Sequence, residues 1–134
     1  MADLPVSRIV ATKGCLALIV GAGLIGAAGV ALAAVAAHKI DSPALVTASS
    51  MLMIHAAAVV AIATVAAALP GYGFVTAGTV MLAAVSLFSG DVALHVTTGS
   101  HIFPFAAPIG GSLTILSWLA VAGCAIAALI RHPR

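Results

Sequence analysis

The chain has 134 residues, of which 63% are hydrophobic and only 6% are charged. Ordinary soluble domains are roughly 45–50% apolar and about 25% charged, so a soluble domain of this composition would leave much apolar surface in contact with water. Disordered chains are poor in apolar residues and rich in charge, which excludes disorder. The composition predicts a single membrane domain that covers residues 1–134.

The charged and cysteine residues exclude two further classes. The five Lys and Arg residues are scattered and the net charge is only +2, so no basic patch is available to bind nucleic acid. Cys15 and Cys124 form neither a CxxC pair nor a zinc-ligand spacing. We expect both thiols to stay reduced, near the cytoplasmic ends of their helices.

The first half of the chain contains two uncharged stretches that are long enough to cross a bilayer, for which about 20 apolar residues suffice. The first predicted helix covers residues 14–37 and follows Lys13. The second covers residues 44–69. Ser42 and Pro43 stand in front of it and fit an N-cap and a first helical turn.

The second half contains two more apolar stretches of sufficient length. A turn signal at residues 70–73 precedes the third predicted helix, residues 73–94, in which Asp91 is the one charged residue. The fourth covers residues 109–130 and follows Pro108. The sequence therefore predicts an all-α, polytopic membrane protein whose four transmembrane helices form an up-down bundle.

The basic residues predict how this bundle is oriented. Four helices in an up-down order place both termini on the same side of the membrane. Basic residues on that side outnumber those on the other by four to one, so the positive-inside rule predicts cytoplasmic termini. The four are Arg8, Lys13, Arg131 and Arg134, and the one on the opposite side is Lys39.

Glycines in the first stretch match a nucleotide-binding pattern. Residues 21–26 read GAGLIG, a literal GxGxxG, and Asp41 follows at the distance of a ribose-binding acid. The helix that the motif should open, residues 24–37, includes no polar side chain, whereas the helix of a dinucleotide-binding domain needs a solvent-facing side. We therefore interpret the glycines as a close-packing face of a transmembrane helix. Gly123 and Ala127 repeat the four-residue spacing of small residues in the fourth helix.

Several short segments, in the same order, resemble one family. They are Ala33–His38, Met53–Ala57, Leu87–Asp91 and Ala107–Gly111, followed by Trp118. The chain resembles the small bacterial membrane proteins catalogued as domain of unknown function 423, to which the eukaryotic transmembrane protein 256 family is similar. The motif residues that carry this resemblance are His38, His55, Ser89, Gly90, Pro108, Gly110 and Gly111.

The sequence departs from the family pattern in three places. Ala36 replaces a glycine of the first motif, Asp91 replaces a serine of the third, and the acidic residue usual before the second histidine is missing. The resemblance implies a four-helix protein of the bacterial inner membrane that contacts lipid. It implies no reaction, because none is assigned to the family.

His55 is the first candidate for chemistry. It lies 12 residues after Pro43, about 18 Å along the helix and therefore near the bilayer centre. An ionisable group at that depth is a candidate for proton or ion transfer. The alternative is a neutral histidine bonded to a hydroxyl of a neighbouring helix, with Ser86 and Ser117 at comparable depth. We favour the alternative because no carboxylate is predicted beside His55.

A second group of polar residues is predicted near the membrane surface opposite the termini. It contains His38, Asp91, His95 and His101, the residue types of a zinc or other divalent-metal site. No pair among them has a recognised ligand spacing, so hydrated interfacial residues are the favoured interpretation. His38 and His55 differ too much in depth to bind one haem between them. We therefore expect no metal and no cofactor.

Gly110 and Gly111 follow Pro108 at the start of the fourth helix. They could expose a helix N-terminus to an anion, but close helix packing is the favoured role. Taken together, the sequence predicts a non-enzymatic accessory subunit that packs against a larger membrane complex or against a second copy of itself. The alternatives are a small transporter or channel, or a metal- or haem-binding membrane protein that uses His55 or the outer His/Asp cluster.

Overall fold

The computed structural model describes residues 12–69 and 71–131. These residues form four α-helices and no strand: α1 (Lys13–His38), α2 (Pro43–Ala68), α3 (Gly73–Thr98) and α4 (Ala106–Arg131), each of 26 residues. At 1.5 Å per residue each helix is about 39 Å long, which exceeds the ~30 Å hydrocarbon core of a bilayer. All four are long and apolar enough to cross a membrane. The predicted all-α, multi-pass fold is confirmed.

Three of the residues used in the sequence predictions lie outside the described part of the chain. They are Arg8 and Arg134, which contribute to the predicted orientation, and Pro70, which contributes to the predicted turn.

Side-chain caps fix the starts of the first two helices. The Thr12 hydroxyl accepts a hydrogen bond from the backbone N–H of Cys15 at 3.3 Å. Ser42 caps α2 by accepting from the N–H of Leu45 at 3.4 Å, and Pro43 occupies the first helical position. Both caps satisfy N–H groups that have no partner inside a helix. The predicted roles of Ser42 and Pro43 are confirmed.

Two helix ends differ from the prediction. α3 continues to Thr98 rather than stopping near Leu94, and it ends at Gly99, whose φ of 75° is left-handed. Asp91 does not end the helix because its carboxylate is buried and hydrogen-bonded within the fold. α4 begins at Ala106, three residues before the predicted start, with Pro108 inside its first turn. Proline is tolerated there because the first N–H groups of a helix have no intrahelical acceptor, so the missing N–H of proline costs no hydrogen bond.

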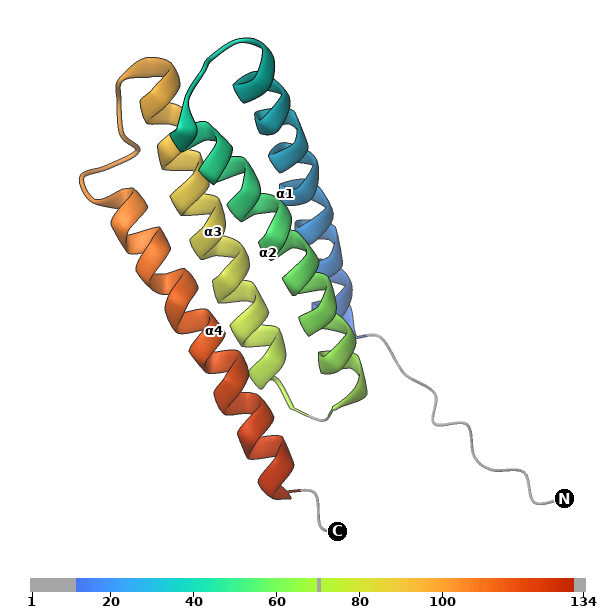
Figure 1. The fold of residues 1–134 in the computed structure, drawn as a ribbon. Helices are drawn as coiled ribbons and strands as arrows, with labels where there is room; N and C mark the ends of the chain where they lie inside the picture. Colours follow the sequence, from blue (N-terminus) through green and yellow to red (C-terminus); the bar gives the residue numbers. More distant parts are fainter. Residues whose placement is uncertain (1–11, 70, 132–134) are drawn as a thin grey trace, which may run out of the picture.

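The helices run alternately up and down (Figure 1). Each packs against its neighbour in sequence, and α1 also contacts α3. α4 packs mainly on α3 and lies at the edge of the bundle (Figure 1). We call the end that carries residues 39–42 and 99–105 the loop end. The opposite end, where α1 begins and α4 finishes, is the termini end.

The apolar core lies between α1, α2 and α3. It is centred on side chains that are almost fully buried: Cys15, Leu18, Ala22, Val59, Ile62, Ala63, Ala66, Phe74 and Met81. Small residues bring these helices close together, since a Cβ added to Gly29 of α1 would lie 3.0 Å from the Cβ of Leu52 in α2. Cys15 and Cys124 are both free thiols. The GxGxxG segment, residues 21–26, lies inside α1, so its interpretation as part of a helix is confirmed.

Candidate functional site

The most heavily bonded polar side chain at the loop end is Asp91 of α3. Its side chain is only 1% exposed. Oδ2 accepts a hydrogen bond from Nδ1 of His101 at 2.9 Å, and Oδ1 accepts from the backbone N–H of Ile102 at 2.8 Å. Both donors lie in the 99–105 connection between α3 and α4. The carboxylate therefore fastens this connection onto α3.

The structure brings together three of the four residues of the predicted outer cluster. The His95 ring stacks on the His101 ring, with centroids 4.1 Å apart and planes within 10°, and His101 in turn bonds Asp91. His38 is an exposed residue at the end of α1 and is not part of this arrangement.

The geometry of the outer cluster does not suit a metal ion. The two stacked imidazoles present their faces to each other, and both Asp91 oxygens already accept protein hydrogens. Within residues 12–69 and 71–131, no three His, Cys, Asp or Glu side chains are grouped closely enough to share one ion.

His55 is buried in the middle of α2 and bonds a residue that the sequence did not single out as its partner. Its Nδ1 lies 2.7 Å from the carbonyl oxygen of Met51, and its Nε2 lies 3.2 Å from Nε1 of Trp118 in α4. A carbonyl only accepts and an indole N–H only donates. His55 therefore carries its hydrogen on Nδ1 and accepts with Nε2, which makes it a neutral side chain with both nitrogens bonded.

The two hydroxyls predicted as partners of His55 are engaged elsewhere. Ser86 donates to the carbonyl of Leu82 and Ser117 to that of Thr114, both at 2.7 Å within their own helices. That part of the prediction is wrong, because a helical serine can satisfy its hydroxyl locally. The sequence did contain one signal for Trp118 as the partner, namely its predicted depth in the membrane. His55 is the thirteenth residue of α2, and Trp118 is the thirteenth of α4.

Gly110 makes the closest approach between α3 and α4. A Cβ added there would lie 2.6 Å from the backbone nitrogen of Phe88 and 2.8 Å from the carbonyl oxygen of Ala84. Gly111 is different, because its added Cβ would meet only the Phe88 ring, at 3.6 Å. Pro108 is exposed in the first turn of α4. The Gly-Gly motif therefore has one glycine on which helix contact depends and one with room for a methyl group.

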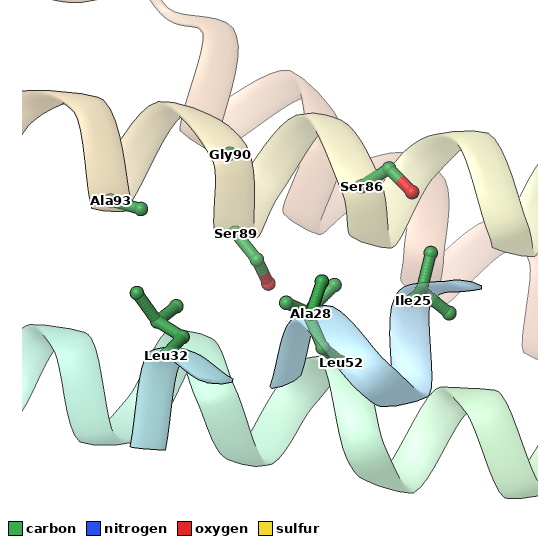
Figure 2. Close-up of a pocket in the computed structure, with 8 residues that line it drawn as sticks. All are labelled: Ile25, Ala28, Leu32, Leu52, Ser86, Ser89, Gly90 and Ala93. Carbon is green, nitrogen blue, oxygen red and sulfur yellow. The ribbon is translucent and has the colours of Figure 1, made fainter. Parts of the chain in front are cut away.

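Ser89 and Gly90 lie on the side of α3 that faces α1. Ser89 is 1% exposed, and its hydroxyl has no hydrogen-bond partner among the described residues. Gly90 is exposed. Both line a cleft of about 270 Å³ that Figure 2 shows in close-up. A second cleft, of about 410 Å³, lies at the termini end beside Tyr72 and Cys124.

Comparison with known proteins identifies the family of the chain. The family model described as Protein of unknown function (DUF423) matches residues 32–111, more than half of the sequence, and the chain belongs to this family. The match includes every motif residue from His38 to Gly111 and stops before Trp118. No curated protein and no solved structure matches the chain. The predicted family is confirmed.

Proposed function

We propose that this member of the domain of unknown function 423 family is a non-enzymatic accessory subunit. In this proposal the second half of α4 packs against a larger membrane complex or against a second copy of the chain. The fold is that of a small multi-pass membrane protein.

The observation that carries the proposal is the distribution of buried residues along α4. Its four buried residues are Ala106, Gly110, Thr114 and Ser117, all in the first half of the helix. Residues 118–131 include none, although they continue through the membrane-spanning segment. The loop-end half of α4 is thus the more deeply buried half. In the other half Val121 and Cys124 still pack on the core, while the opposite side of the helix is left free.

The free half of α4 carries the residues that membrane helices use to associate. A Cβ added to Gly123 would meet no atom within 4 Å, and Ala120, one turn away, is exposed. Between helices in lipid there is little hydrophobic driving force, so association depends on close backbone contact at small residues. Gly123 and Ala120 form a flat patch on α4, and lipid chains fill such a patch less completely than a second helix does. Large apolar side chains, including Leu119 and Ile126, flank the patch.

The polar groups support a role without catalysis. Both nitrogens of His55 and both oxygens of Asp91 are already used in hydrogen bonds that connect parts of the fold. A proton relay or an ion pathway needs an ionisable group with a free position. These bonds favour an architectural role for both residues over transport.

The proposal also assigns a membrane and an orientation. Lys13 and Arg131 lie at the termini end of the helices and Lys39 at the loop end, and the sequence adds Arg8 and Arg134 beside the termini. The positive-inside rule then places the termini end in the cytoplasm. The family resemblance points to the bacterial inner membrane.

Site-specific photocrosslinking tests the accessory role. A photoreactive phenylalanine analogue is placed at Leu119 or Ile126 of α4, and at Leu24 of α1 as the control; all three side chains are 59–69% exposed. We expect a protein adduct of one defined mass from both α4 positions and none from Leu24. An adduct of twice 13.1 kDa identifies a second copy, and any other mass identifies another subunit.

A packing variant makes the same test specific. Gly123→Leu fills the flat patch, so we expect it to abolish the adducts and to reduce the native mass in mild detergent to that of the lone chain. Equal crosslinking from α1 and α4, or a wild-type chain that is always extracted as a lone monomer, would refute the proposal.

A further inference from the structure

The cleft beside Ser89 is a groove that opens toward the lipid between α1 and α3, and we call it the α1–α3 groove. Ile25, Ala28 and Leu32 form its α1 side, Leu52 its floor on α2, and residues 86–93 its α3 side. Ala28 and Gly90 are exposed, so the groove can be entered from the membrane. Seven residues of α1 separate its ends, which makes it about 10 Å long.

Ser89 is the polar feature of this groove that the fold leaves unused. The other buried helical hydroxyls, Ser49, Thr114 and Ser117, each donate to a carbonyl of their own helix at 2.7–2.9 Å. The Ser89 hydroxyl has no such partner among the described residues. Figure 2 shows it pointing out of α3 toward Ala28 of α1. What this hydroxyl lacks is an acceptor for its hydrogen.

The depth of Ser89 limits what can supply that acceptor. Ser89 lies nine residues before the end of α3 at Thr98, about 14 Å along the helix. A helix of about 39 Å extends roughly 5 Å beyond each surface of a 30 Å core. The hydroxyl is then about 9 Å inside the hydrocarbon, below the ester carbonyls of phospholipids, which lie at the headgroup boundary.

The size of the groove limits the occupant further. A 10 Å length of α-helix with side chains fills about 800 Å³, since its diameter is about 10 Å. The groove provides about 270 Å³, which suits a single ring system or chain and is too small for a helix of another protein.

We propose that the α1–α3 groove binds an uncharged, lipid-soluble carbonyl compound of the quinone or long-chain ketone class, whose carbonyl accepts the hydrogen of Ser89. The apolar walls from Ile25 to Leu32 hold its hydrocarbon part. This site is separate from the free half of α4 and does not depend on the proposed accessory role.

A matched pair of probes tests the hydrogen bond directly. The probes are tritiated 2-decyl-1,4-naphthoquinone and 2-decylnaphthalene, which share their ring system and chain and differ in the two carbonyls. Binding is measured to the full chain in phosphatidylcholine nanodiscs, and binding to empty nanodiscs is subtracted. We expect saturable binding of the quinone that is about fivefold tighter than that of the hydrocarbon, the effect of one net hydrogen bond.

Three variants complete the test. Ser89→Ala should make the two probes bind equally, and it should not lower the stability of the bundle, because it removes an unbonded hydroxyl. Ser86→Ala is the control, since its hydroxyl lines the same groove but already donates to Leu82, and it should leave the fivefold difference intact. Ala28→Leu should fill the groove and remove saturable binding of both probes.

Each possible result either supports the proposed binding site or overturns it. A fivefold preference that is lost in Ser89→Ala and kept in Ser86→Ala establishes the site. Equal binding of the two probes to the wild-type chain, a preference that survives Ser89→Ala, or binding no greater than that to empty nanodiscs overturns the proposal. The last result would mean that the groove holds only bulk acyl chains.

Discussion

Replacing Gly110 with alanine would place a methyl group against the backbone of α3. The added Cβ would lie 2.6 Å from the nitrogen of Phe88 and 2.8 Å from the oxygen of Ala84, whereas ordinary contacts begin at 3.4 Å. α4 would therefore have to move away by about 0.8 Å. Because the opposing atoms are backbone, no change of rotamer relieves the contact. Overpacking of this kind costs about 1–3 kcal/mol.

The movement of α4 would also weaken the hydrogen bond between Trp118 and His55 at mid-membrane. Nε1 of Trp118 lies 3.2 Å from Nε2 of His55, and a shift of similar size at that level would break the hydrogen bond. Such bonds between membrane helices contribute about 0.6 kcal/mol on average and at most ~1.7. We therefore expect the cost of the close contact and of the weakened bond in Gly110→Ala to total about 2–3 kcal/mol, before the gain from better helix propensity.

Gly111→Ala is the matched control. Both substitutions gain the same helix propensity, up to about 1 kcal/mol, but the Cβ at Gly111 meets only the Phe88 ring at 3.6 Å. The difference between the two variants therefore isolates the packing contribution. We expect Gly111→Ala to be neutral or slightly stabilising, and Gly110→Ala to be about 2–3 kcal/mol less stable than Gly111→Ala.

Unfolding by a denaturing detergent measures this difference. Trp118 is the only tryptophan of the chain and contacts α2 from α4, so its fluorescence reports whether α4 is attached, while far-ultraviolet circular dichroism reports the helices themselves. If Gly110→Ala proves as stable as Gly111→Ala, the approach of α4 to α3 is looser than described, and the packing role of Gly110 is refuted.

Three further predictions concern the other attachments and the orientation. Trp118→Phe should destabilise the chain by about 1–2 kcal/mol, because it leaves a buried His55 nitrogen without a donor. In the His55→Leu background the same change should cost much less. Equal costs in both backgrounds would show that the two residues are not coupled. Asp91→Ala should speed hydrogen exchange of the Ile102 amide at least tenfold, because the amide loses its acceptor. Asp91→Asn keeps one carbonyl oxygen and should have a smaller effect. Exchange that does not change in Asp91→Ala would contradict the conclusion that Asp91 holds the 99–105 connection onto α3. Finally, Ser100→Cys in a cysteine-free background should react with an impermeant thiol reagent in intact cells, since the proposed orientation places the loop end outside; reaction only after the membrane is opened would reverse that orientation.

Much of the fold could be predicted because its elements are set by local sequence. An uncharged stretch of more than 20 residues must form a helix in lipid, where every backbone group needs an internal partner. Ser42 and Pro43 mark a helix start through chemistry that acts within one turn. The end of α3 was placed four residues too early. The donors that satisfy the Asp91 carboxylate come ten and eleven residues later, from the connection to α4, and no local signal announces them.

The contacts between helices could not be read in the same way. These helices are apolar on all sides, so no stripe of polar residues shows which face each one buries. Gly110 and Gly111 are chemically identical in the sequence, and only the position of α3 distinguishes them. The bond from Trp118 to His55 depends on two helices that are not neighbours in sequence. Depth alone narrows such partners to a few candidates and does not choose among them.

The attachments of α4 bear on the proposed accessory role of its second half. The Asp91 contacts with the 99–105 connection lie at the loop end, the Gly110 contact lies in the same half, and the bond from Trp118 lies at mid-helix. Residues 119–131 are covered less: none of them is fully buried, and Val121 and Cys124 pack on the core from one side of the helix. A helix held against the bundle along one side presents its outer side in a defined position, which lowers the entropy that a partner must remove on binding. If α4 associates as we propose, Gly110→Ala should weaken crosslinking from Ile126, even though the two residues are about 24 Å apart along the helix.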